Sequence, residues 1–313
     1  MLTLQVARRV EEADGIAGLV LIDPQGGELP EWTPGAHIDV HVDRPGESAL
    51  VRQYSLCGDP ADRSSYRIAV LLEQDGQGGS RSIHDSVRAG QLVRVSAPRE
   101  LFGFEPGARM VFVAGGIGIT PILPMLAAAE ASGAQWELHY AGREPGTMAF
   151  GAELERFGEH VRVYASAAGE RMALPAIVAS AAGATVYACG PSRLLDELET
   201  LCAEAGVDLR VERFVNDTAV DAETDHPFEV ELSLTGTSFV VQPGESILDR
   251  VVAAGVPAPS SCRGGTCGTC ETFVVEGEPD HRDAVLNARE REESEVMMIC
   301  VSRCKGARLV LEL

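Results

Sequence analysis

Positive charge is scarce in this sequence of 313 residues. Lysine and arginine together number 26 against 47 aspartates and glutamates, which gives a formal net charge of −21. The acidic excess is spread along the chain and does not form a separate tail. Nucleic acids and anionic membrane surfaces would repel such a chain, so we expect neither of them as a partner.

Hydrophobic runs suited to targeting or membrane insertion are also missing. Residues 1–14 contain no apolar core of a secretory signal peptide. The two longest uncharged runs, 110–129 and 172–192, are long enough to span a bilayer, but they are interrupted by glycine and proline and are rich in alanine. We therefore expect a cytoplasmic, monomeric protein without a transmembrane segment.

Three patterns follow one another along the chain. Residues 1–106 hold short alternating or apolar runs separated by Gly, Pro and Asp, which predicts a small antiparallel β-barrel. From 107 to 215 apolar strands alternate with helical segments, which predicts a doubly wound α/β domain. The polar stretch 216–226 is typical of a linker. Residues 227–313 begin again with a strand pair and a helix near 245–255.

Half of the eight cysteines belong to one pattern near the C-terminus. Cys262, Cys267 and Cys270 have the spacing C-x4-C-x2-C, and Cys300 follows after 29 further residues. This is the ligand pattern of a plant-type 2Fe-2S ferredoxin, in which four thiolates hold two irons. The glycines of the loop permit a tight, partly left-handed backbone. A zinc site or a set of free thiols is the alternative, but zinc sites usually pair two C-x2-C units and this loop has one.

A second glycine-rich segment, GGIGITP at 115–121, follows an apolar strand and leads into a helical pattern. Such a turn lets a pyrophosphate approach the backbone, and the positive end of the helix favours the anion. Thr120 is expected to cap the helix and Pro121 to suit its first position. The segment CGP at 189–191 repeats the arrangement, so two turns would flank one crevice. Because the G-x-G-x-x-G fingerprint is missing, a bare sharp turn is the alternative.

Two weaker segments lie in the N-terminal part. Arg52, Tyr54 and Ser55 end a strand-like run, and GQGGSRS at 76–82 supplies glycines with hydroxyls. An arginine, backbone N–H groups and serine hydroxyls together make a sensible phosphate cradle. A barrel strand followed by a hairpin loop is the alternative for both segments.

Other groups that could suggest chemistry are expected to be structural. Cys202 lies in a helical apolar pattern, and Cys304 lies four residues beyond Cys300 without matching the ligand spacing. We expect no functional role for the following residues: Cys57, Cys202, Cys304, His37, His41, His84 and His226.

Five motifs follow one another along the chain: RQYS, GGS, GGIGITP, CGP and C-x4-C-x2-C…C. In this order they resemble the phthalate dioxygenase reductase-like family, reductase components of Rieske-type oxygenases within the ferredoxin-NAD(P)+ reductase superfamily. The resemblance covers essentially the whole chain. It implies a flavin-binding barrel at 1–106, an NAD-binding domain at 107–215 and a ferredoxin domain of the α+β, β-grasp type at 227–313.

The resemblance also implies roles for individual residues. Contacts to the flavin would come from Arg52, Tyr54, Ser55, Ala69, Val70, Leu71, Gly78, Gly79, Ser80 and Phe214. The nicotinamide dinucleotide would meet Gly115, Gly116, Ile117, Gly118, Thr120, Pro121, Cys189, Gly190 and Pro191. Of these, Ser55 and Cys189 would stand nearest the reacting atoms, with Cys189 positioning the nicotinamide and not acting as a nucleophile.

The same resemblance suggests the cofactors and the acceptor. The GGS form of the phosphate loop favours FMN, with FAD as the alternative, and the absence of a clear basic pair around Arg143 and Arg171 favours NADH over NADPH. NADH would pass a hydride to the flavin, which would send single electrons through the 2Fe-2S cluster to a terminal oxygenase or demethylase protein. Two other functions stay open: a reductase for a haem-thiolate monooxygenase, and a non-catalytic redox-sensing electron carrier.

Overall fold

The computed structural model describes residues 1–42, 50–74, 78–217 and 225–313. They form two compact units, Met1–Glu212 and Arg213–Leu313. The predicted linker at 216–226 includes residues 218–224, which lie outside the described residues. Of the helices within the described ranges, none combines the length and the apolar character that a bilayer span requires.

The first unit begins with an antiparallel sheet of seven strands. These are β1 (Leu2–Ala13), β2 (Ile16–Ile22), β3 (Ala36–Val42), β4 (Leu50–Ser55), β5 (Ser65–Leu71), β6 (Leu92–Val95) and β7 (Arg99–Glu100). They pair in the order β4-β3-β6-β1-β2-β5, and β7 joins β3. Their alternating apolar side chains fill one core, and helix α1 (Gly79–Ser86) packs on β4 and β5, the two ends of that order. The predicted antiparallel barrel is confirmed.

A parallel sheet of five strands makes up the rest of this unit. It contains β8 (Arg109–Gly115), β9 (Gln135–Gly142), β10 (Val161–Ala165), β11 (Thr185–Cys189) and β12 (Asp208–Glu212) in the order β10-β9-β8-β11-β12. The main helices are α2 (Ile119–Ser132), α3 (Gly151–Leu154), α4 (Leu174–Ser180) and α5 (Ser192–Ala205). Short 3-10 turns are η1 (Gly116–Gly118), η2 (Pro145–Thr147), η3 (Glu155–His160) and η4 (Ser166–Ala168).

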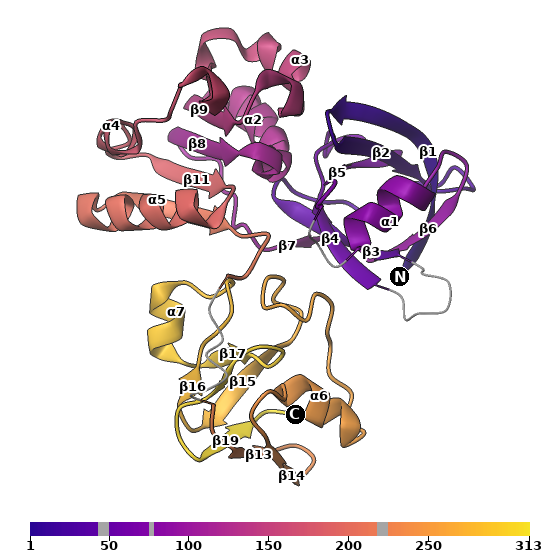
Figure 1. Cartoon of the computed structure of the whole chain (residues 1–313), viewed down its shortest axis with the longest axis vertical. Coiled ribbons are helices and arrows are strands. Elements are labelled where there is room, and N and C mark those ends of the chain that lie inside the picture. Colours follow the sequence, from indigo (N-terminus) through magenta and orange to yellow (C-terminus); the bar gives the residue numbers. More distant parts are fainter. Residues whose placement is uncertain (43–49, 75–77, 218–224) are drawn as a thin grey trace. The chain divides into compact units, whose positions relative to one another are not determined.

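Helices cover both faces of this parallel sheet. Phe112 of β8 packs with residues of α2, whereas the neighbouring Val113 packs with α4 and α5. Figure 1 shows α2 on one side of the sheet and α4 and α5 on the other. The predicted doubly wound architecture is therefore confirmed.

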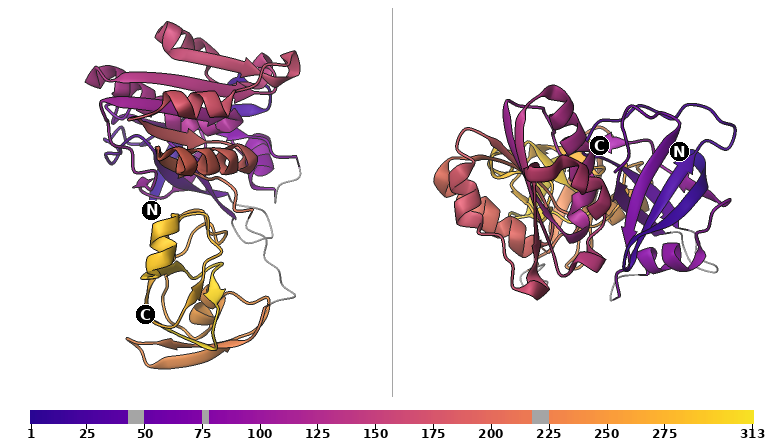
Figure 2. Two further views of the ribbon diagram at one scale, coloured as in Figure 1. Left: turned by 90° about the vertical axis from the view of Figure 1, so that its left-hand side faces the viewer. Right: turned by 90° about the horizontal axis from the view of Figure 1, so that it is seen from above.

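The barrel and the parallel sheet share a hydrophobic core. Ile16 and Ala69 of the barrel belong to the same buried cluster as Phe112 and Met125. At the same junction Arg67 of β5 forms an ion pair with Glu12 of β1 at 2.8 Å and, across the junction, another with Glu153 of α3 at 2.6 Å. The two sheets lie side by side in the right-hand view of Figure 2. Apart from Phe214, the residues expected to bind the flavin and the nicotinamide are thereby held in one unit.

The second unit has a mixed five-stranded sheet in the order β14-β13-β19-β15-β17 and a two-stranded sheet of β16 and β18. The strands are β13 (Phe228–Leu232), β14 (Thr237–Val241), β15 (Glu271–Glu276), β16 (Pro279–Asp280), β17 (Val296–Met298), β18 (Arg303–Cys304) and β19 (Arg308–Leu311). Helix α6 (Ile247–Ala253) packs its apolar side chains on the larger sheet, and α7 (Ala288–Glu293) lies between β16 and β17 in the chain. This arrangement confirms the predicted β-grasp domain.

One local alternative does not hold. A hairpin loop was the alternative interpretation of the segment 76–82, but from Gly79 onward this segment is the first turn of α1. Gly78 takes a left-handed φ of 85° and redirects the chain into the helix. The helix is stabilised by packing on β4 and β5, which a local sequence pattern does not reveal.

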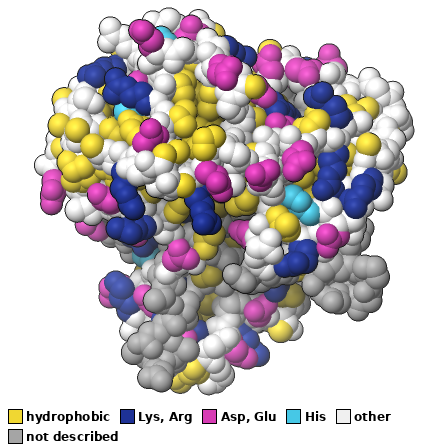
Figure 3. Space-filling view, turned by 45° about the horizontal axis from the view of Figure 1, so that its top comes forward, with side chains coloured by type: hydrophobic (Ala, Val, Ile, Leu, Met, Phe, Trp, Pro, Cys, Tyr) yellow, Lys and Arg dark blue, Asp and Glu magenta, His cyan; other side chains and the backbone are white. Residues whose placement is uncertain are grey.

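Surface charge is mixed, in keeping with the spread of acidic residues along the sequence. On the face drawn in Figure 3, acidic and basic side chains are interspersed, with hydrophobic side chains between them. The negative charge is therefore not gathered into one patch on that face.

Candidate functional site

The predicted flavin residues gather where β4, β5 and α1 meet. Arg52 lies on β4, and a Cβ atom added to Gly79 would be 2.7 Å from its Cγ and Nε atoms. Gly79 therefore lets the arginine lie against the first turn of α1, whose free N–H groups favour an anion. Ser80 is buried, and its Oγ accepts the Glu73 N–H at 3.1 Å, which leaves the Ser80 hydroxyl hydrogen available to a ligand.

Ser55, at the end of β4, carries an orphaned polar group. Its side chain is only 4% exposed, and its Oγ has no hydrogen-bond partner within the described ranges. A buried hydroxyl without a partner is costly, so the site is suited to a ligand that accepts or donates there. Close to it, burial raises the pKa of Tyr54, which stays a neutral phenol.

On the other side, β5 supplies Ala69, Val70 and Leu71. Ala69 and Val70 are buried, whereas Leu71 is 37% exposed. The Val70 carbonyl accepts a hydrogen bond from His84 Nε2 at 2.8 Å, which ties β5 to α1. The residues present thus fit a flavin with its phosphate at α1.

Two glycine turns meet at the carboxyl ends of β8 and β11. A Cβ on Gly118 would lie 2.3 Å from the Cys189 carbonyl oxygen, and one on Gly190 would lie 3.0 Å from Gly115 Cα. These three glycines are therefore required because the turns pack backbone to backbone. Gly116 differs, since its φ is 55° and nothing lies within 4 Å of its Cβ direction. It is the glycine that leaves room for a ligand.

The expected cap of the following helix is wrong. Helix α2 begins at Ile119 with Gly118 as N-cap, and no side chain caps it. The Thr120 hydroxyl instead donates to the Ile117 carbonyl at 2.9 Å, and Pro121 is the third helical residue. The 3-10 turn at 116–118 runs directly into the helix, and the Ile119 N–H bonds to the Gly116 and Ile117 carbonyls, so the N–H groups without an intrahelical acceptor belong to the turn itself.

Cys189 is fully buried in this crevice. Burial raises the pKa of its thiol, and the nearby Glu212 carboxylate raises it further, so it stays protonated. This agrees with a positioning role and argues against a nucleophile. Pro191 precedes α5 and takes its N-cap position.

Glu212 is a candidate residue that the sequence reasoning missed. It pairs in register with Cys189 across β11 and β12. Its Oε2 is buried without a hydrogen-bond partner in the described part of the chain. Burial and the charge of Glu100 raise its pKa to about 8. Only this β-sheet register, and no local motif, brings the carboxyl group to the crevice.

The turn expected to bind the nicotinamide and the strand expected to bind the flavin are neighbours. The η1 turn, Gly116–Gly118, contacts β5, the strand that carries Ala69, Val70 and Leu71. A dinucleotide on this turn and a flavin on β5 would therefore have adjacent sites within one unit. Phe214 belongs to the second unit and is 40% exposed, so its contact with the flavin stays a prediction.

In the cysteine loop of the second unit, backbone N–H groups point toward a cysteine sulfur. Cys267, Cys270 and Cys300 are buried and Cys262 is partly exposed. The Cys262 Sγ accepts the N–H groups of Gly264 at 3.3 Å and Thr266 at 3.5 Å. The left-handed positions of the loop are Arg263, Gly265 and Gly268, so Arg263 takes the conformation that had been expected at Gly264.

The four thiols lie close enough to share protons. The pKa of Cys262 is lowered because the thiols of Cys267 and Cys300 donate hydrogen bonds to its sulfur, and the pKa of Cys270 is lowered by the Cys300 thiol. Across the described ranges, no three His, Cys, Asp or Glu side chains surround a point suited to one metal ion. Four clustered thiols in this spacing suit a two-iron cluster, with two thiolates for each iron.

The other cysteines take no part in these sites. Cys57, Cys202 and Cys304 are buried in three separate hydrophobic clusters. Burial raises the pKa of Cys57 to about 12, which keeps it an inert thiol.

Known proteins are similar in sequence to this chain. Residues 230–305 match the family model described as 2Fe-2S iron-sulfur cluster binding domain. The carnitine monooxygenase reductase subunit of Escherichia coli K12 is 37% identical over 100% of this chain and 98% of its own length. The vanillate O-demethylase oxidoreductase of Pseudomonas sp. strain HR199 is 39% identical over 96% of each chain.

Two solved structures are similar over the whole chain. An intact type IV self-sufficient cytochrome P450 monooxygenase is 43% identical with a TM-score of 0.90, but this chain spans only 41% of its length. Phthalate dioxygenase reductase, a modular structure for electron transfer from pyridine nucleotides to [2Fe-2S], is 37% identical with a TM-score of 0.71, over 100% of this chain and 98% of its own. The chain therefore belongs to the phthalate dioxygenase reductase-like family, the flavin and iron-sulfur oxidoreductases that serve oxygenase systems as reductase components.

Proposed function

We propose that this chain oxidises NADH at an FMN and delivers the electrons singly, through a 2Fe-2S cluster, to a terminal oxygenase or demethylase. The observation that carries the proposal is the contact between the η1 turn and β5, which makes the nicotinamide and flavin sites neighbours. We further propose the functional division into a flavin domain at 1–106, an NAD domain at 107–215 and a ferredoxin domain at 227–313. The protein is proposed to act as a cytoplasmic monomer.

FMN is favoured because the phosphate cradle is compact. Arg52 lies directly against Gly79, and within the described ranges no side chain caps α1, so its first N–H groups would receive a terminal phosphate. Ser55 is placed to form a hydrogen bond with the reactive edge of the ring through its orphaned hydroxyl. When bound, the flavin supplies the exchange between two-electron and one-electron chemistry.

The residues of the nicotinamide crevice bind the dinucleotide and orient its nicotinamide ring. Gly116 leaves open space for the dinucleotide, and the buried Cys189 thiol shapes the end of the crevice. Glu212 holds a proton below about pH 8 and keeps its carboxyl group uncharged beside Cys189. In the second unit Cys262, Cys267, Cys270 and Cys300 would hold the cluster, and loop N–H groups stabilise the sulfur charge.

NADH is favoured over NADPH by local charge. Arg143 and Arg171 are both exposed, and each is adjacent in sequence to a glutamate, Glu144 and Glu170. The two pairs are formally neutral, so they provide little attraction for the 2′-phosphate that distinguishes NADPH.

Steady-state turnover tests the proposal. The purified protein should oxidise NADH rapidly with cytochrome c as an artificial one-electron acceptor, and NADPH should be used at least tenfold less efficiently. A protein that binds both cofactors but shows no NADH turnover would support the non-catalytic redox carrier instead.

A haem-thiolate monooxygenase is a second candidate acceptor. The 43% identity to the self-sufficient cytochrome P450 favours it, because the matched part of that protein resembles this whole chain. Reconstitution with a purified Rieske-type oxygenase and with a purified cytochrome P450, at equal concentrations, separates the two. Product formation with the Rieske enzyme alone supports the first acceptor, and product formation with the P450 alone supports the second.

A further inference from the structure

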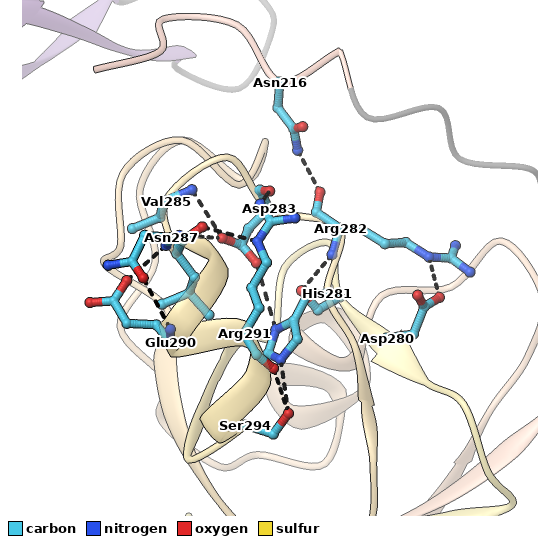
Figure 4. A network of polar contacts seen from close by, with 12 residues as sticks. Asn216, Asp280, His281, Arg282, Asp283, Val285, Asn287, Glu290, Arg291 and Ser294 are labelled. Atoms are coloured by element: carbon cyan, nitrogen blue, oxygen red, sulfur yellow. Dashed lines mark hydrogen bonds and ion pairs between the residues drawn. The ribbon is translucent and has the colours of Figure 1, made fainter. Parts of the chain in front are cut away.

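Asn216, at the N-terminal edge of the second unit, contacts the cysteine loop of that unit. Its Nδ2 donates to the Arg282 carbonyl at 2.7 Å and to the Gly264 carbonyl at 3.0 Å. In Figure 4 its amide points from its own chain segment toward Arg282. One side-chain amide thus joins a loop residue next to Cys262 to a separate segment at 280–286.

The loop is closely packed at this point. A Cβ on Gly265 would lie 2.8 Å from Asn216 Nδ2 and 2.6 Å from Val301 Cγ2. The Gly265 carbonyl accepts the Ala284 N–H at 2.8 Å. Asn216, Val301 and the segment at 280–286 therefore surround Gly265 and fix the course of the loop.

The segment that receives Asn216 is itself rigid. Asp283 is fully buried, and its Oδ1 accepts the N–H groups of Val285 at 2.9 Å and Leu286 at 2.8 Å. Arg291 donates to the carbonyls of Asp283 and Leu286, as Figure 4 shows in part. The Arg282 carbonyl is therefore a fixed acceptor for Asn216.

Arg282 also anchors the chain on the far side of residues 218–224. Its Nη2 forms an ion pair with Asp225 at 2.7 Å, and Arg303 Nε lies 3.3 Å from the same carboxylate. The Asp225 side chain is only 1% exposed. The described residues on both sides of 218–224 thus contact Arg282. Asn216 bonds to its carbonyl through a side-chain amide, and Asp225 forms a buried ion pair with its guanidinium.

We propose that Asn216 is a positioning residue for the cluster, which holds residues 263–266 in the conformation that points the Gly264 and Thr266 N–H groups at the Cys262 sulfur. Hydrogen bonds to cluster sulfurs stabilise the reduced, more negative state and so set the reduction potential. The inference rests on the proposed function, since it requires a 2Fe-2S cluster on the four cysteines.

Two variants of Asn216 and one control test the role. Asn216→Asp keeps the size but places a carboxylate against two carbonyl oxygens, and Asn216→Ala removes the donor without repulsion. Arg289→Gln is the control, because this side chain on α7 is 85% exposed and forms an ion pair with Glu293 of the same helix. All three proteins keep the four cysteines and the first unit.

The readouts are the cluster's EPR and visible circular dichroism spectra, its reduction equilibrium against a redox dye, and hydrogen exchange of residues 262–268. We expect both Asn216 variants to change the spectra and to shift the one-electron equilibrium constant at least tenfold, equivalent to 59 mV, toward the oxidised state. Hydrogen exchange in the loop should become at least tenfold faster in apo Asn216→Ala. NADH-driven flavin reduction should stay within twofold, and Arg289→Gln should match the wild type.

Wild-type spectra, equilibrium and exchange in both Asn216 variants would overturn the positioning role. If Asn216→Asp does not assemble a cluster, the same readouts on Asn216→Ala alone test the positioning role. A wild-type protein that holds no 2Fe-2S cluster would instead contradict the proposed function, which keeps the two failures distinct.

Discussion

Gly118 and Cys189 approach so closely that a Cβ atom on Gly118 would lie 2.3 Å from the Cys189 carbonyl oxygen. The obstacle is backbone, which has little freedom to move. The close approach fixes the distance between the two turns that flank the nicotinamide crevice.

Replacing Gly118 with alanine should therefore force the turns apart. We expect Gly118→Ala to reduce kcat/KM for NADH-driven flavin reduction at least 100-fold, measured by stopped-flow absorbance. Gly183→Ala is the control, because this glycine has nothing within 4 Å of its Cβ direction, although its φ of 74° is left-handed whereas that of Gly118 is −62°. It should lose about 1 kcal/mol of stability and keep its rate within twofold. Equal rates in the two variants would contradict the crevice assignment.

Removal of one cluster ligand should separate the two halves of the reaction. Cys267→Ser is expected to lose the 2Fe-2S spectrum while NADH still reduces the flavin at nearly the wild-type rate. Cys304→Ser is the matched control, since Cys304 is equally buried but outside the ligand pattern, and its cluster spectrum should persist. A native cluster spectrum in Cys267→Ser would show that the ligand set is wrong.

The cluster ligands could be predicted because three of the four lie within nine residues, where spacing alone carries the chemistry. Glu212 and Asn216 have no such local signal. Glu212 meets Cys189 through strand register, and Asn216 bonds to residues 48 and 66 positions away. Long-range contacts of this kind arise from the folded topology and not from any short motif.

The positions of the two glycine turns were predicted from the sequence, but the role of their glycines was predicted only in part. The sequence pattern suggested that the glycines of the first turn let a pyrophosphate approach the backbone, whereas Gly115, Gly118 and Gly190 make room for the opposite turn. The start of α1 was missed in the same way, because its packing on β4 and β5 outweighs the loop preference of Gly78 and Gly79. In both cases the deciding neighbour is distant in sequence.

Loss of the Arg52 guanidinium should weaken flavin binding. A charge-assisted contact is worth about 1.5–3 kcal/mol, so the Kd of FMN in Arg52→Ala should rise roughly 10- to 150-fold. Arg8→Ala provides the control, as Arg8 is an exposed residue of β1. Fluorescence titration of the apoprotein with FMN measures both. An unchanged Kd in Arg52→Ala would remove the residue from the phosphate cradle.

The raised pKa of Glu212 predicts a dependence of stability on pH. Because that pKa is about 8 in the folded protein and ordinarily 4.5, the folded chain binds an extra proton between these values. Stability should therefore fall as the pH rises from about 4.5 to 8 and then level off. Thermal unfolding at pH 6 and pH 8.5 should show a smaller loss for Glu212→Gln than for the wild type. The exposed Glu204→Gln should behave like the wild type, and an identical loss in all three proteins would argue against a buried Glu212.

Anaerobic titration of the FMN- and cluster-loaded protein with NADH tests the central claim most directly. Absorbance should show bleaching of the flavin and reduction of the 2Fe-2S cluster, with 1.5 equivalents of NADH supplying the three electrons that the two centres accept. If NADH bleaches neither centre, or bleaches the flavin while the cluster stays oxidised, the proposed electron path through this chain is contradicted.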